Sequence, residues 1–164
     1  MKSYLSDPNV AIIGLGNVLL ADDGAGVHAV RELLKEPPEG VIVAEIGTAV
    51  LRAQELLERA DVVIAIDAVK ADGPPGSIYR FNSCDAHMSK SFSIHDLGII
   101  AMLRLLPEHS RPAVIILGIE PQLIDYGMEL SPPVQAELPR LVDAARCIAR
   151  RIVEGTRPGY GVVA

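Results

Sequence analysis

Four short and almost wholly apolar runs constrain the fold of this 164-residue chain more than any other feature of its sequence. They cover residues 10–13, 41–46, 62–66 and 113–119, and each is bounded by glycine, an acid or proline. Runs too brief for a helix and this apolar are typical of strands buried on both faces of a sheet. Between the first three runs, apolar residues recur at the spacings of three and four that amphipathic helices show. The alternation predicts a βαβαβ chain.

A further strand is expected at residues 77–81, directly after the Gly-rich and Pro-rich turn at 72–76. So short a connection predicts an antiparallel strand at or near an edge of the sheet. We therefore predict an α/β fold, with one doubly wound domain over 1–164 and a mostly parallel five-stranded sheet that has one antiparallel strand and is flanked by helices. Its core is expected at 9–154, followed by a flexible tail at 155–164.

Two more helices are predicted in the second half of the chain. One runs from about 94 to 106, where Ser93 and Asp96 have the spacing of a capping box. The other begins at Ser131, as a hydroxyl cap before two prolines, and ends at Gly155.

Charge and composition exclude several classes of function. The formal net charge is −6, and no Lys/Arg cluster is longer than Arg150-Arg151, so we expect no nucleic-acid partner. The sequence shows neither the apolar segment of a signal peptide nor the ~20 apolar residues that span a bilayer, so we expect a cytoplasmic protein without membrane insertion. The isolated Cys84 and Cys147 predict no disulfide, and Cys147 is expected on an apolar helix face.

A glycine-rich segment with two acids follows the first apolar run. Gly14, Gly16 and Gly24 surround Asp22 and Asp23 within this segment. A glycine-rich turn from strand to helix usually cradles a phosphate, because its backbone N–H groups attract anions. Two carboxylates at that turn would repel a phosphate and attract a cation, so the segment favours metal or cation recognition.

Other polar residues follow the remaining strands. Glu45, Asp67 and Glu120 each stand at the end of a predicted parallel strand, and His95 stands at the start of the third helix. In an open α/β sheet these ends meet at the edge where ligands bind. The sequence therefore predicts a cluster of acids, with His95, at the carboxyl edge of the sheet.

Each candidate also has a purely structural interpretation. Asp22 fits best as the cap of the following helix. For Asp23, the structural alternative is a solvated acid in the first turn, but this is not the favoured interpretation. Asp67 is harder to explain this way, because a carboxylate in a buried strand needs a partner, although a hydrogen-bonded structural role stays open. His28 is interpreted as a surface or packing residue.

Asp23, Asp67 and His95 remain as the strongest set. The helix dipole disfavours an imidazolium at His95 and keeps a lone pair available for a metal. Two carboxylates and one imidazole with open positions are typical of a metal site that engages a substrate.

Two other classes of function fit less well. The dinucleotide fingerprint is incomplete, because Leu19 occupies its third glycine position, although Glu45 has the place of a ribose-binding acid. The sequence contains neither the Gly-x-Ser-x-Gly elbow of a serine hydrolase nor a cysteine in a glycine-rich turn, so a serine or cysteine hydrolase is also disfavoured.

Seven motifs together resemble, in order, the maturation endopeptidases of nickel-iron hydrogenases. They are Gly-Leu-Gly-Asn at 14–17, Asp-Asp-Gly-Ala-Gly at 22–26, Glu-Ile-Gly-Thr at 45–48, Ile-Asp-Ala at 66–68, His-Asp-Leu-Gly at 95–98, Gly-Ile-Glu-Pro at 118–121 and Leu-Ser-Pro at 130–132. The resemblance covers roughly residues 9–154.

The resemblance implies a cytoplasmic protease that trims the C-terminal extension from the hydrogenase large-subunit precursor after nickel insertion. It implies that Asp23, Asp67 and His95 contact the metal, with Asp23 at a position that is glutamate in some relatives. It also implies substrate positioning by Asn17 and by the turn of Gly47 and Thr48. The family is commonly grouped with aspartic-type peptidases.

The hypothesis from the sequence is that nickel arrives in the precursor and that the three ligands recognise it. Asp23 and Asp67 are the candidate catalytic residues, and either a carboxylate or the metal activates the reaction. A non-catalytic nickel-binding chaperone and a nucleotide-binding module remain as alternatives.

Overall fold

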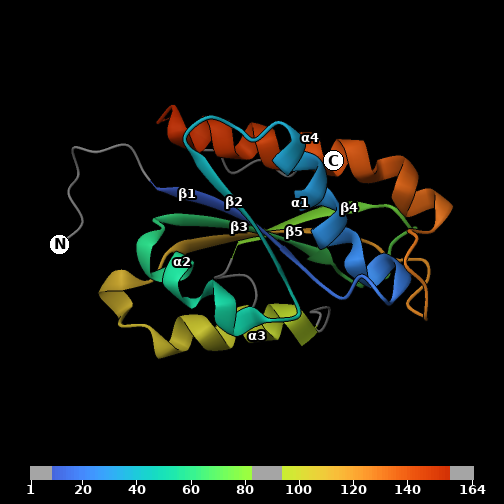
Figure 1. Ribbon diagram of the computed structural model, residues 1–164, viewed down its shortest axis with the longest axis horizontal. Coiled ribbons are helices and arrows are strands. Elements are labelled where there is room, and N and C mark those ends of the chain that lie inside the picture. The colour runs from blue at the N-terminus through green and yellow to red at the C-terminus, as the bar shows by residue number, and fades with distance from the viewer. Residues whose placement is uncertain (1–8, 83–93, 156–164) are drawn as a thin grey trace.

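The computed structural model describes residues 9–82 and 94–155, and in helix α3 the side chains from Ile99 onward (Figure 1). The elements in chain order are β1 (Val10–Leu15), η1 (Ala21–Gly24), α1 (Ala25–Lys35), β2 (Val41–Gly47), η2 (Val50–Ala53), α2 (Gln54–Arg59), β3 (Val62–Ala68), β4 (Ile78–Asn82), α3 (Ile94–Leu105), η4 (Glu108–Ser110), β5 (Ala113–Ile119) and α4 (Pro132–Val153).

The five strands form one mixed sheet in the order β2-β1-β3-β5-β4. The pairs β1/β2, β1/β3 and β3/β5 are parallel, and β4 runs antiparallel to β5 at the edge. The predicted fold class is thereby confirmed, including the antiparallel strand at an edge.

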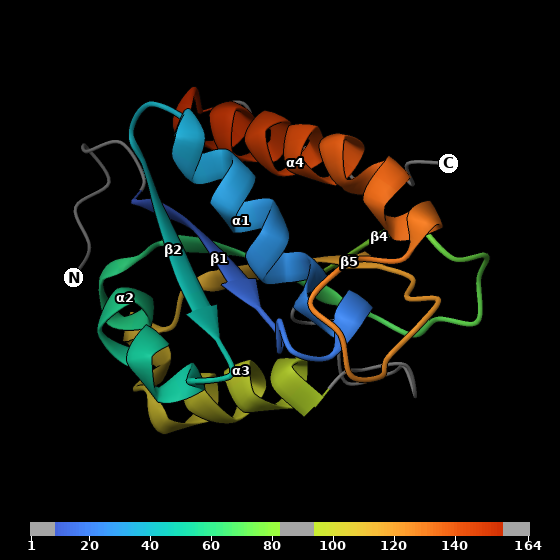
Figure 2. The same cartoon turned by 45° about the vertical axis from the view of Figure 1, so that its right-hand side comes forward.

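Helices cover both faces of the sheet. In both views, α1 and α4 lie on one side, and α2 and α3 lie on the other (Figures 1 and 2). Neighbouring residues of β1 serve the two cores in turn, because Ile12 packs under α1 and α4 whereas Ile13 packs towards α2 and α3. Both side chains are fully buried, which contributes roughly 1.5–3 kcal/mol each relative to exposure.

Close packing of α1 against the sheet explains one of the glycines. A Cβ on Gly26 would collide with the backbone carbonyl of Ile66 in β3. The close contact between helix and sheet therefore explains why glycine is required at this position, without a phosphate-binding role.

Two expectations about local structure are wrong. Ser131 is the N-cap residue of α4, but its side chain makes no capping hydrogen bond, because its hydroxyl is committed elsewhere, as described below. Cys147 is exposed on α4, so its expected place on the apolar face is incorrect.

Several sequence predictions fall outside the described residues, namely the Ser93 cap, the environment of Cys84 and most of the predicted tail. The final helix ends at Val153, slightly before the expected Gly155. Within the described ranges, no helix combines the length and apolar character needed to cross a membrane.

Candidate functional site

The turn after β1 brings the backbone of the glycine-rich segment against β3. Gly16 has φ +113°, a conformation that L side chains rarely adopt, and its N–H donates to the Gly47 carbonyl at 3.1 Å. A Cβ at Gly16 would strike the carbonyl of Asp23 and lie 3.3 Å from Oδ1 of Asp67. Glycine at this position therefore lets two of the predicted site residues approach each other.

Asp23 directs its carboxylate into the turn that precedes it. Its Oδ2 accepts the backbone N–H of Asn17 at 2.9 Å, and the residue is 9% exposed. In a nucleotide-binding turn, such an N–H would face a phosphate oxygen. Here the Asp23 carboxylate accepts this N–H in place of a phosphate oxygen, so the turn disfavours an anionic ligand.

Asp67 lies near the end of β3 and is fully buried. Its Oδ1 accepts the N–H of the next residue, Ala68, at 2.8 Å, and this same oxygen is the atom beside Gly16. The predicted proximity of Asp67 to the segment that carries Asp23 is therefore present in the structure.

Asp22 does not cap helix α1, which corrects the favoured interpretation of this residue. No side-chain capping bond is made at the start of α1 or η1. Its buried carboxylate instead accepts the N–H groups of Gln122 and Leu123 at 2.9 and 2.8 Å, and both the N–H and hydroxyl of Ser131 at 2.7 Å. Asp22 therefore joins the glycine-rich segment to the loop between β5 and α4.

Glu45 does not join the predicted acid cluster. Both of its carboxylate oxygens accept bonds from Arg31 of α1, at 2.9 and 3.0 Å, on a partly exposed surface. The hydrogen bond from Arg31 lowers the pKa of Glu45 and raises the pKa of the guanidinium. Glu45 is committed to a surface ion pair on the edge strand β2.

Glu120 is likewise engaged outside the cluster. Its Oε2 accepts the Tyr79 hydroxyl at 2.9 Å and the Ala71 N–H at 2.8 Å. Burial, followed by the bond to Glu120, raises the pKa of Tyr79. Glu120 thus fastens the connection between β3 and β4 to the end of β5.

The remaining predicted residues border the same turn. Asn17 accepts the N–H of Leu19 with its side-chain oxygen at 2.9 Å. Gly47 is the last residue of β2 and has φ +63°, and Thr48 is exposed. His95 lies in the first turn of α3, whose start is on the side to which the arrowheads of β1 and β2 point (Figure 2). The side chain of His95 lies outside the described part of the structure.

His28 packs beside the loop that follows β5. This position is compatible with its interpretation as a surface or packing residue. Its ring bonds to the backbone of Met128, and among the described residues its buried Nε2 has no hydrogen-bond partner. Burial, followed by the charge of Arg31, lowers the pKa of His28.

Among the described residues, no group of three His, Cys, Asp or Glu side chains has the arrangement of a metal site. Asp23 and Asp67 are two of the three predicted ligands, and the third is the undescribed side chain of His95. Oδ1 of Asp67 lies beside Gly16, and the Asp23 carboxylate accepts the N–H of the next residue, Asn17. Carboxylates at such a turn can contact a cation or activate a water molecule.

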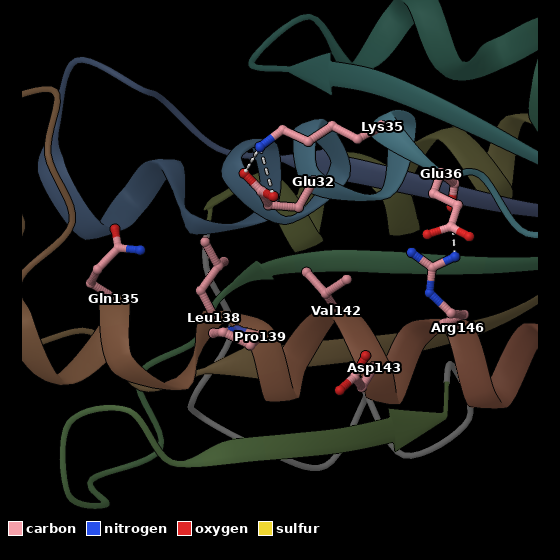
Figure 3. A pocket seen from close by; sticks show the side chains of 9 residues that line it. All are labelled: Glu32, Lys35, Glu36, Gln135, Leu138, Pro139, Val142, Asp143 and Arg146. Carbon is pink, nitrogen blue, oxygen red and sulfur yellow. Dashed lines mark hydrogen bonds and ion pairs between the residues drawn. The ribbon is translucent and has the colours of Figure 1, made fainter.

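A separate groove of about 490 Å³ lies between α1 and α4 (Figure 3). Its charged groups are largely satisfied locally, because Lys35 bonds to Glu32 and Arg146 donates to the carbonyl of Glu36. None of the predicted site residues lines this groove. The groove is therefore distinct from the carboxyl edge of the sheet.

Sequence reasoning missed the loop that follows β5 as a partner of the glycine-rich segment. The available indication was the cluster of large apolar residues at 123–128, which fits neither a strand nor a helix pattern. In both ribbon views this loop lies against the segment after β1 (Figures 1 and 2).

Comparisons with known proteins agree on one family. A sequence profile described as hydrogenase maturation protease matches residues 27–147, a range that contains Asp67 and His95 and begins after Asp23. A hydrogenase expression/formation protein, HupM of Azotobacter chroococcum mcd 1, is 35% identical over 162 residues, covering 92% of this chain and 77% of the relative.

Solved structures show the same fold. The nickel-iron hydrogenase maturation protease HybD from Thermococcus kodakarensis is 32% identical with a TM-score of 0.75, over 86% of this chain and 99% of that one. The hydrogenase maturating endopeptidase HybD from E. coli has a TM-score of 0.78 at 23% identity, over 87% and 93%, and supports the fold alone.

Proposed function

Because this chain belongs to the family of hydrogenase maturation proteases, we propose that it is the endopeptidase that removes the C-terminal extension of a nickel-loaded hydrogenase large-subunit precursor. The observation that carries the proposal is that Asp67 Oδ1 lies beside Gly16 while the Asp23 carboxylate accepts the N–H of the adjacent Asn17, at the carboxyl edge of the sheet. This edge is where open α/β sheets bind their ligands.

In this proposal nickel belongs to the substrate and is recognised by Asp23, Asp67 and His95. Carboxylate oxygens and an imidazole nitrogen are suitable donors for a divalent metal. The turn at Gly16 holds the two aspartates in place before substrate arrives, which lowers the entropic cost of recognition. Asn17, Gly47 and Thr48 border the turn and would position the scissile segment.

The proposed chemistry is addition of water across one peptide bond. A carboxylate takes a proton from water, the resulting hydroxide forms a bond to the carbonyl carbon, and the leaving amine receives a proton as the C–N bond breaks. Asp23 is assigned as this base because it is 9% exposed, whereas Asp67 is fully buried. Substrate nickel would polarise the carbonyl as a Lewis acid.

The proposal is tested by incubating the purified protein with nickel-loaded precursor and following the large subunit by gel and mass spectrometry. A shortened large subunit is expected with wild type and with Glu45→Gln, which alters a carboxylate outside the site. Asp23→Asn and Asp67→Asn should each lower the rate at least about a hundredfold. Full activity in either aspartate variant would overturn the assignment.

This assay and a nucleotide-binding measurement separate the alternatives. A non-catalytic chaperone would bind nickel and leave the precursor at its original length. A nucleotide-binding module would bind an adenine nucleotide in a calorimeter, which the Asp23 carboxylate in the glycine turn opposes.

A further inference from the structure

Five large apolar side chains are exposed together on the two loops beside the candidate site. Tyr126 is 90% exposed, Met128 65%, Leu19 55%, Leu123 49% and Ile124 41%. We call these five residues the apolar platform. Single exposed apolar residues are ordinary, but a concentration of them on adjoining loops marks an interaction site.

The platform is held in a fixed arrangement by backbone hydrogen bonds between the two loops. The N–H of Ala21 donates to the Gly127 carbonyl at 2.7 Å, and the N–H of Gly127 donates to the Leu19 carbonyl at 3.0 Å. Asp22 adds a third bond, from its N–H to the Leu123 carbonyl at 3.1 Å, besides the bonds to its carboxylate. The side chains are therefore presented on an ordered backbone, which reduces the entropy lost on binding.

The platform is continuous with the candidate site through the glycine-rich segment. The N–H of Leu19 donates to the side chain of Asn17, whose own N–H donates to Asp23. A partner seated on the platform would therefore lie beside Asp23.

The charges around the platform indicate the chemistry of its partner. Asp125 and Glu129 are exposed within the loop after β5. No lysine or arginine occurs in residues 14–30 or 113–139, which contain both loops. An apolar surface on loops that carry two exposed acids and neither lysine nor arginine fits a partner with an apolar patch flanked by lysine or arginine.

We propose that the apolar platform docks the folded body of the precursor protein, through an apolar patch with basic neighbours, and so places the scissile segment at Asp23. This inference rests on the proposed function for the identity of the partner. The platform contributes affinity that is independent of nickel, whereas the aspartates and His95 respond to nickel.

The test compares Tyr126→Ser and Leu123→Ser with the control Leu105→Ser, which removes an apolar side chain that is 78% exposed on α3. Binding of nickel-loaded and nickel-free precursor is measured by biolayer interferometry, and cleavage is followed as kcat and KM. Circular dichroism checks that the variants remain folded, as expected for substitutions of exposed side chains.

The platform variants should weaken binding about tenfold to a hundredfold, by the same factor for both forms of the precursor, and raise KM with little change in kcat. Leu105→Ser should match wild type. Unchanged affinity in both platform variants would overturn the docking surface, even if cleavage proceeds normally. If the variants lose self-association but still bind the precursor, the occupant of the platform is a second copy of this chain. That result would also overturn the proposal that the platform docks the precursor. Absence of cleavage by wild type, with binding still weakened in the variants, would contradict the proposed protease activity alone.

Discussion

The carboxylate of Asp22 accepts both the backbone N–H and the hydroxyl of Ser131, each at 2.7 Å, across 109 residues of sequence. The same carboxylate accepts the N–H groups of Gln122 and Leu123. One buried side chain therefore sets the position of the loop after β5 relative to the glycine-rich segment. Its neighbour Asp23 is left to face the turn at Asn17.

Asp22→Asn should destabilise the protein by roughly 2–4 kcal/mol. The carboxylate now accepts several N–H and O–H donors, and the NH₂ group of asparagine would face some of these donors without an acceptor. Urea unfolding followed by circular dichroism measures this loss. Asp143→Asn, on the exposed face of α4, is the matched control and should change the free energy of unfolding by less than about 0.5 kcal/mol. Equal stability of the two variants would contradict the role given to Asp22.

Gly16→Ala should cost at least about 3 kcal/mol, because the backbone conformation is unsuited to alanine and the new Cβ would strike Asp23. Gly40→Ala separates these two causes. Gly40 also has a positive φ, +71°, but a Cβ added there would lie 3.7 Å from a Val153 methyl, an ordinary contact, so only about 1 kcal/mol is expected. Thermal unfolding of both variants gives the comparison, and similar losses would show that contact with Asp23 is unimportant.

His28 should make the protein less stable as the pH falls below its ordinary pKa of 6.5. Burial and the charge of Arg31 lower its pKa in the folded state, so the unfolded chain binds the proton more readily. Stability is therefore greatest above about pH 6.5 and declines as the pH falls towards the folded-state pKa.

The measurement is urea unfolding between about pH 5 and 7.5. His28→Gln should flatten the pH dependence, whereas His109→Gln, on the exposed η4 segment, should retain it. Identical slopes in wild type and His28→Gln would rule out this residue as the source.

Glu45→Gln should lower the free energy of unfolding by less than about 1 kcal/mol, because its ion pair with Arg31 is partly exposed. Processing of the precursor should remain within about twofold of the wild-type rate. A severe loss of activity in a folded Glu45→Gln protein would place Glu45 in the site after all.

Apolar runs located four strands to within a few residues, and the turn at 72–76 located β4. The expectation that all four apolar runs are buried on both faces is wrong for β2, because β2 is an edge strand and most of its residues are only partly buried. The acids were harder to assign. The position of an acid at a strand end does not reveal its partner. Glu45 accepts hydrogen bonds from Arg31 of α1, and Glu120 accepts one from Tyr79 of β4.

The division of roles between Asp22 and Asp23 was equally hidden. The two residues are adjacent, and the short η1 helix sends one carboxylate to Ser131 and the other to Asn17. Both partners were visible in the sequence, but nothing local connects Asp22 with a serine at the start of α4.

Nickel recognition by Asp23, Asp67 and His95 is tested most directly by presenting the purified protein with nickel-loaded and nickel-free precursor side by side. The initial rate of appearance of the shortened large subunit is the quantity to measure. The proposed mechanism predicts cleavage of the nickel-loaded form and little or none of the nickel-free form at the same concentration. Equal cleavage of both forms would contradict it.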